Sequence, residues 1–98
     1  MRVDDIYRAI ADPVRRAIVE ELTRRNDQTL YELCMRLMGR GFAMSRQAVA
    51  KHVAVLAEAG AVRTTTQGRT TIHHLHPGPL DAVRDWLATI AEQDERES

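Results

Sequence analysis

The side chains best suited to binding chemistry lie close together near the start of one segment, residues 44–61. At about 100° per residue, Gln47, Ala50 and Lys51 fall on one face of a helix, and Val49 and Val53 fall on the other. Glutamine and lysine bind base edges and phosphates, and a small residue such as Ala50 lets the helix backbone approach DNA. The segment therefore predicts a helix that buries one face and offers the other to a major groove. An isolated helix of this pattern is more often simply solvated, so the neighbouring elements decide between the two interpretations.

Capping signals set the limits of this helix and of those before it. Ser45 can accept a hydrogen bond from a free N–H of the first turn, and Gly60 tolerates the positive φ that ends helices. Asp12 precedes a proline, and Thr29 precedes Glu32 at the spacing of a capping box, so both mark earlier helix starts. Helices are expected over residues 3–11, 13–25, 29–38, 45–59 and 80–92, with a turn at 26–28 and a connector at 39–44.

A β-hairpin is predicted directly after the basic helix. Residues 61–66 and 70–75 are rich in Val, Thr and Ile, and the short loop between them contains Gly68, which can take a positive φ. Arg63 lies on the first strand and Arg69 lies beside the tip, so the hairpin is expected to act as a wing that touches the DNA backbone or the minor groove. The alternative is a solvated hairpin with incidental arginines.

The charges of the chain are unevenly distributed, although they sum to zero. Residues 40–79 carry a net charge of +4, whereas residues 80–98 carry −4. The basic part coincides with the predicted groove-binding helix and hairpin, which favours a nucleic-acid partner. The composition, 44% hydrophobic and 29% charged, is typical of a globular domain, and no apolar run is long enough to span a membrane. A single cysteine and the lack of a signal-peptide pattern favour a cytoplasmic chain.

Apolar residues at helical spacing also follow the first and last predicted helices. The last helix carries the only tryptophan and has more apolar surface than a core of this size requires. We expect these residues to form a homodimer interface, with the alternative that all of them belong to the core. They are Ile6, Tyr7, Ile10, Leu80, Val83, Trp86, Leu87 and Ile90.

Metal and catalytic chemistry find little support in the remaining residues. His73 and His74 point to opposite faces of a strand and His76 lies at its end, so we expect no metal site and no cofactor. Cys34 lies on an apolar stripe, where cysteine is usually a small core residue. No nucleophile with an adjacent base and no paired carboxylates in a pocket are indicated, so no catalytic residues and no enzymatic activity are expected.

Several segments resemble the ArsR-type winged helix-turn-helix repressors of bacteria. Residues 11–18, Ala-Asp-Pro-Val-Arg-Arg-Ala-Ile, resemble the family's approach to its second helix. Residues 45–56, Ser-Arg-Gln-Ala-Val-Ala-Lys-His-Val-Ala-Val-Leu, and residues 58–62, Glu-Ala-Gly-Ala-Val, resemble its recognition helix and the run into the wing. Residues 67–69, Gln-Gly-Arg, resemble its wing tip. The resemblance covers nearly the whole chain and implies one domain over residues 1–98, mainly α with a two-stranded β wing in the order α-α-α-α-β-β-α.

The resemblance implies a homodimeric repressor that binds an inverted-repeat operator in double-stranded DNA and leaves it when an unidentified inducer arrives. Dimer contacts of the family map onto the first and last helices. Of the DNA-contacting positions, Arg46 and Gln47 are our candidates for reading bases, and Lys51, Arg63 and Arg69 for holding phosphates. The matching positions are Ser45, Arg46, Gln47, Lys51, His52, Arg63, Gln67 and Arg69.

Two departures from the family pattern bear on sensing and on geometry. Metal-sensing members often carry Cys-x-Cys in the third helix, but here Arg36 follows Cys34 at the second position, and the last helix has no histidine. The connector at residues 39–44 is longer than the family's tight turn. Two alternatives stay open: a winged-helix module that binds proteins through its acidic last helix, and a thiol-responsive repressor that uses Cys34.

Overall fold

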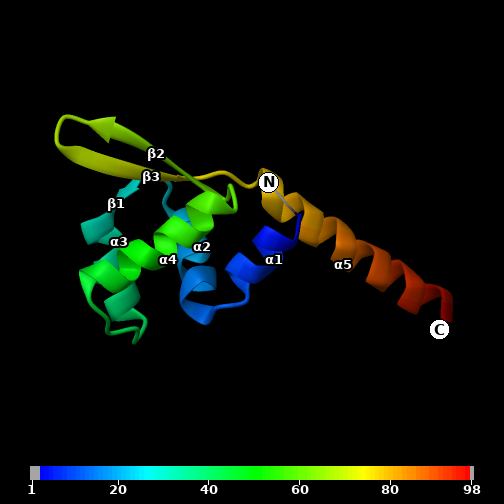
Figure 1. Ribbon diagram of the computed structural model, residues 1–98. Coiled ribbons are helices and arrows are strands. Elements are labelled where there is room, and N and C mark those ends of the chain that lie inside the picture. Colours follow the sequence, from blue (N-terminus) through cyan, green and yellow to red (C-terminus); the bar gives the residue numbers. More distant parts are fainter. Residues whose placement is uncertain (1–2, 98) are drawn as a thin grey trace.

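The computed structural model describes residues 3–97, and these form an elongated molecule of about 53 × 28 × 21 Å. Figure 1 shows α1 to α4 gathered in one body, a β-hairpin extending from one side of it, and α5 running away on the other. The elements are α1 (Val3–Ile10), α2 (Pro13–Arg24), β1 (Gln28–Thr29), α3 (Leu30–Gly39), α4 (Arg46–Glu58), β2 (Val62–Gln67), β3 (Thr70–Leu75) and α5 (Gly78–Glu97).

The predicted helix caps are present. The Asp12 carboxylate accepts hydrogen bonds from the N–H groups of Val14 and Arg15 at 2.8 and 3.2 Å. Thr29 and Glu32 form a reciprocal capping box, each side chain accepting from the other's backbone N–H at 3.1 Å. The pKa of Glu32 lies below its ordinary value because the carboxylate accepts the hydrogen bond from the Thr29 N–H. These local contacts explain why the helix starts could be predicted from sequence.

Ser45 and Gly60 set the two ends of α4. The Ser45 hydroxyl accepts a hydrogen bond from the Ala48 N–H at 3.1 Å, which satisfies one of the free donors of the first turn. Gly60 has a φ of +81°, a backbone conformation that glycine adopts without the steric cost that a Cβ atom would add. The recognition-helix candidate therefore has the limits expected from sequence.

The sheet has one strand more than the sequence predicted. Its order is β1-β3-β2, all antiparallel, and the hairpin pairs Val62 with Leu75 through to Gln67 with Thr70. The two-residue strand β1, part of which was expected to be a turn, pairs Gln28 with His73 and Thr29 with Ile72. A two-stranded hairpin is marginally stable by itself, and β1 attaches its base to the helices.

The core lies among α1 to α4 and under the base of the hairpin. Its largest fully buried side chains include Ile18 and Leu22 of α2, Leu33 and Leu37 of α3, and Leu56 of α4. Ile18 and Leu22, like Leu33 and Leu37, are four residues apart and therefore lie on one face of their helix. Their burial fixes the three helices against one another, and this leaves the opposite face of α4 to solvent.

The long connector between α3 and α4 is a compact turn. Its Gly41 has a φ of +91°, and the Phe42 N–H donates to the Leu37 carbonyl at 2.9 Å, which turns the chain back at the end of α3. Phe42 and Met44 are partly buried and pack against the core. The extra residues relative to a tight turn are thus anchored, and α3 and α4 remain in contact as a helix-turn-helix pair.

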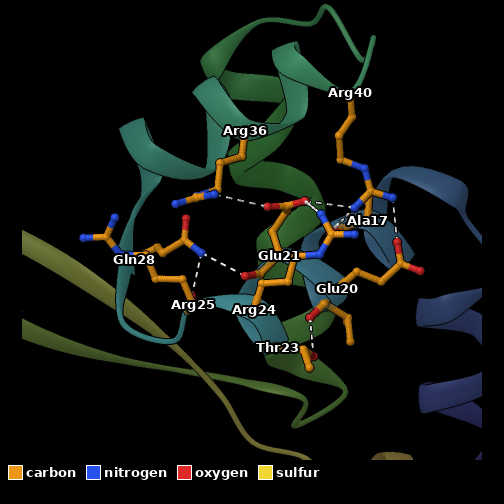
Figure 2. Close-up of polar contacts among 10 residues, drawn as sticks. Ala17, Glu20, Glu21, Thr23, Arg24, Arg25, Gln28, Arg36 and Arg40 are labelled. Atoms are coloured by element: carbon orange, nitrogen blue, oxygen red, sulfur yellow. Dashed lines mark hydrogen bonds and ion pairs between the residues drawn. The ribbon is translucent and has the colours of Figure 1, made fainter.

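A buried carboxylate that the sequence did not predict joins α2 to α3. Glu21 is 3% exposed, and its oxygens lie 3.1 Å from Arg40 Nη1, 3.3 Å from Arg24 Nη1 and 3.6 Å from Arg36 Nη1 (Figure 2). Arg40 also binds Glu20 at 2.6 Å, and the two carboxylates raise the pKa of Arg40. Arg40 was counted in the basic centre of the sequence, but its charge is neutralised within the protein and does not add to the DNA-binding surface.

The last helix begins earlier and ends later than expected. It starts at Gly78 instead of Leu80 and continues to Glu97 instead of about Glu92. Its first turns pack on α1, where the Tyr7 hydroxyl donates to the Ala82 carbonyl at 3.4 Å. The Tyr7 ring also packs edge-on against the Trp86 ring, with the two ring centroids 5.9 Å apart. The rest of α5 extends beyond the body of the molecule (Figure 1).

Candidate nucleic-acid interface

The outward face of α4 carries the polar residues that the sequence singled out. Ser45, Arg46, Gln47 and Lys51 are all exposed, whereas Val49 on the opposite face is buried. Neither Arg46 nor Lys51 has a hydrogen-bond or ion-pair partner among the described residues. Two unpaired cations at the first turns of an exposed helix can bind anionic phosphate at little desolvation cost.

The wing presents a second polar surface. Gln67 and Arg69 are exposed at and beside its tip, where Gly68 takes a φ of +62° to close the hairpin. Arg69 has no partner among the residues that the structure describes. Arg63 is also exposed, and its Nη2 lies 3.2 Å from Nε2 of His76 at the other end of the hairpin. The predicted wing residues therefore all face solvent, and Arg69 lies at the same end of the hairpin as Gln67.

A groove lies between the helix-turn-helix and the wing and brings two of the predicted residues together. It has a volume of about 540 Å³ and is lined by Arg46 of α4, by Arg69 and Thr70 of the wing, and by Thr29 and Tyr31 at the start of α3, among others. Tyr31 is 62% exposed. The sequence patterns did not single out Tyr31, although its position off the apolar stripe of α3, as the second residue of that helix, could have indicated an outward side chain.

His52 lies at the edge of α4 nearest α2. Its Nδ1 is 3.1 Å from Nη1 of Arg15, whose Nε also donates to the Ala9 carbonyl at 2.6 Å. A guanidinium can only donate, so His52 Nδ1 is the acceptor and the neutral ring carries its proton on Nε2. Nε2 is therefore the atom that can donate to an external acceptor such as phosphate.

The other histidines have separate neighbours. His73 is buried with its Nδ1 3.0 Å from the Gln28 carbonyl oxygen, and His74 contacts Asp27 and Thr65. Within residues 3–97, no group of three or more His, Cys, Asp or Glu side chains is placed to share a metal ion. Cys34 is half-buried against the core and its thiol is not in a disulfide.

The residues predicted for a dimer interface fall into three groups. Ile6 is 2% exposed and belongs to the core of its own chain, while four residues are partly buried against that core. Those four are Tyr7, Ile10, Leu80 and Val83. Trp86, Leu87 and Ile90 of α5 are 51%, 53% and 48% exposed. The apolar surface that remains available therefore lies mainly on the protruding part of α5.

None of the helices within residues 3–97 combines the length and the hydropathy needed to cross a bilayer.

A helix-turn-helix with an outward polar second helix, followed by a β-hairpin, defines the winged helix-turn-helix class of DNA-binding proteins.

Comparison with known proteins identifies the family within this class. The helix-turn-helix domain family matches residues 10–65. The HTH-type transcriptional regulator YuzN of Bacillus subtilis (strain 168) is 38% identical over 86 residues, which cover 86% of this chain and 94% of that protein. The crystal structure of an ArsR family transcriptional regulator is 35% identical, with a TM-score of 0.76 over 94% of this chain and 89% of that chain. An ArsR-like transcriptional regulator from Rhodococcus sp. RHA1 is 29% identical, with a TM-score of 0.79 over 97% of this chain and 82% of that chain.

The chain belongs to the ArsR family of winged helix-turn-helix transcriptional regulators, and it is a DNA-binding protein.

Proposed function

We propose that two copies of this chain form a homodimer that represses transcription in the cytoplasm by occupying an inverted-repeat operator. The observation that carries this proposal is the separation of two surfaces in one chain. Unpaired Arg46, Lys51 and Arg69 face solvent on the helix-turn-helix and wing, and exposed Trp86 and Ile90 lie on α5. One surface suits DNA and the other suits a second copy.

The proposed roles on DNA follow from side-chain chemistry and position. Gln47 can make paired hydrogen bonds to an adenine edge in the major groove. Lys51 and Arg69 bear unpaired charges, and Arg63 is exposed, so all three are proposed to hold phosphates. Ser45, His52 and Gln67 are proposed as further polar contacts: Ser45 beside the first turn of α4, His52 through Nε2, and Gln67 at the wing tip.

Dimerisation would place two α4 helices in successive major grooves of one duplex face. The interface is proposed to use the exposed apolar residues Trp86, Leu87 and Ile90 of α5 together with the adjoining surface of α1 around Tyr7 and Ile10. Half-sites would then lie about one helical turn apart, or a multiple of it. The two-fold axis of the protein would match the dyad of the operator.

In vitro selection from random duplexes, followed by a promoter reporter, tests the proposal. The expected result is an inverted repeat whose insertion beside a promoter lowers transcription when the protein is produced. Recovery of no sequence, together with binding that does not depend on salt, would instead support a protein-docking module. Activation in place of repression would contradict the repressor role while leaving DNA binding intact.

A further inference from the structure

The groove between the helix-turn-helix and the wing carries positive charge with no acidic side chain among the described residues that line it. Arg46 and Arg69 enter it from two different elements, and neither guanidinium has a partner in the described part of the chain. Two like charges in one groove of about 540 Å³ repel each other unless an anion lies between them.

The acidic residue closest in sequence to the groove lining is already engaged. Glu32, on the first turn of α3, accepts the Thr29 N–H in the capping box and pairs with Arg25 at 3.6 Å. The hydroxyls of Tyr31 and Thr70, which also line the groove, are in contrast exposed, and neither has a partner in residues 3–97. Two guanidinium groups beside hydroxyl donors match the hydrogen-bonding needs of a phosphate oxygen.

We infer that this groove holds one backbone phosphate of the bound DNA, gripped by Arg46 and Arg69 together and by the hydroxyl of Tyr31. The inference rests on the proposed binding of duplex DNA by α4 and the wing. It changes the role predicted for Arg46, from reading a base to positioning the strand. Gln47 then remains as the base-reading side chain of the first turn.

The position of Arg46 on α4 supports this change of role. Consecutive residues of a helix point about 100° apart, and Arg46 lines the groove beside the wing whereas Gln47 does not. Arg46 lines the groove that separates α4 from the wing, where a DNA strand has to pass if both elements contact the duplex. A protruding phosphate fits such a concave site better than the flat edge of a base pair does.

Neutral methylphosphonates at single positions of the selected operator test the inference. With the wild-type protein, replacement of the phosphate held in this groove, one per half-site, should weaken binding as measured by fluorescence anisotropy. With Arg46→Ala and with Arg69→Ala the same replacement should cause a smaller loss, because one of the two guanidinium contacts is already absent. Tyr31→Phe should reduce the loss at that phosphate only in part. Because the two arginines share one phosphate, Arg46→Ala and Arg69→Ala combined should lower the slope of log affinity against log salt by about one unit and not by two, equally for operator and unrelated duplexes.

Two controls separate this inference from the proposed function. Arg84→Ala removes an exposed arginine of α5 that pairs with Asp81 and Asp85 of the same helix among the described residues, and it should keep the wild-type pattern. Circular dichroism verifies that each variant folds. If Arg46→Ala stays as sensitive to that phosphate as the wild-type protein and loses discrimination between base pairs, the inference is wrong although the protein binds DNA. If the wild-type protein shows no salt-dependent binding to any duplex, the proposed function itself fails.

Discussion

The exposed apolar face of α5 gives a quantitative prediction about assembly. Ile90 is 48% exposed in the single chain, so about half of its side chain is available to be buried by a second copy. Full burial of an isoleucine side chain contributes about 1.5–3 kcal/mol, so half contributes roughly 1 kcal/mol per copy. Two-fold symmetry doubles the effect, and Ile90→Asp should weaken the dimer by ~2 kcal/mol, roughly 30-fold in dissociation constant, from lost burial alone. Burial of an unpaired carboxylate would increase the loss.

Sedimentation equilibrium of the wild-type protein and of Ile90→Asp measures this difference. Ala88→Asp is the matched control, because it adds the same charge at an exposed position well away from the apolar stripe of α5. The expected result is a monomer–dimer equilibrium that shifts strongly toward monomer for Ile90→Asp and stays near wild type for Ala88→Asp. Equal dimer affinity for all three proteins would refute the assignment of the interface to α5.

Two further predictions concern stability. Glu21→Gln replaces a carboxylate oxygen that faces three arginines by an amide N–H₂, so we expect a loss of about 1–3 kcal/mol in urea unfolding; unchanged stability would show that the buried ion cluster is energetically neutral. Thr29→Ala removes the cap of α3 and should cost about 1 kcal/mol. The pKa of Glu32 is held below its ordinary value of 4.5 in the folded protein. The ionised carboxylate therefore contributes to the stability of the fold above that pH, and this stability is lost as pH falls through the lower pKa of the folded state. Glu32→Gln should therefore flatten this part of the acid dependence of stability, and an identical pH profile for variant and wild type would contradict the reasoning.

Elements whose ends depend on neighbouring residues could be predicted from the sequence. The caps at Asp12, Thr29 and Ser45 act within three residues, and Gly60 and Gly68 are needed where the backbone takes positive φ. Periodicity then placed the apolar faces of the helices, and with them the outward face of α4.

Features that depend on distant parts of the chain could not be predicted in this way. Strand β1 exists because Gln28 meets His73, and two residues of local sequence contain no strand signal. Glu21 falls on the same face of α2 as Ile18 and Leu22, but only the packing of α2 against α3 brings Arg36 and Arg40 to it. The groove at Arg46 likewise requires the wing to lie beside α3 and α4, which no spacing within either segment reveals.

The proposed function depends most on the outward face of α4 reading DNA. Its most direct test is the affinity for the selected operator across a salt series, for the wild-type protein, Lys51→Ala and Gln47→Ala. We predict that Lys51→Ala lowers the salt slope by about one unit on every duplex. Gln47→Ala should keep the slope and lose about 1–3 kcal/mol of discrimination at one base pair in each half-site. Wild-type slopes and wild-type discrimination in both variants would contradict the claim that this helix contacts DNA.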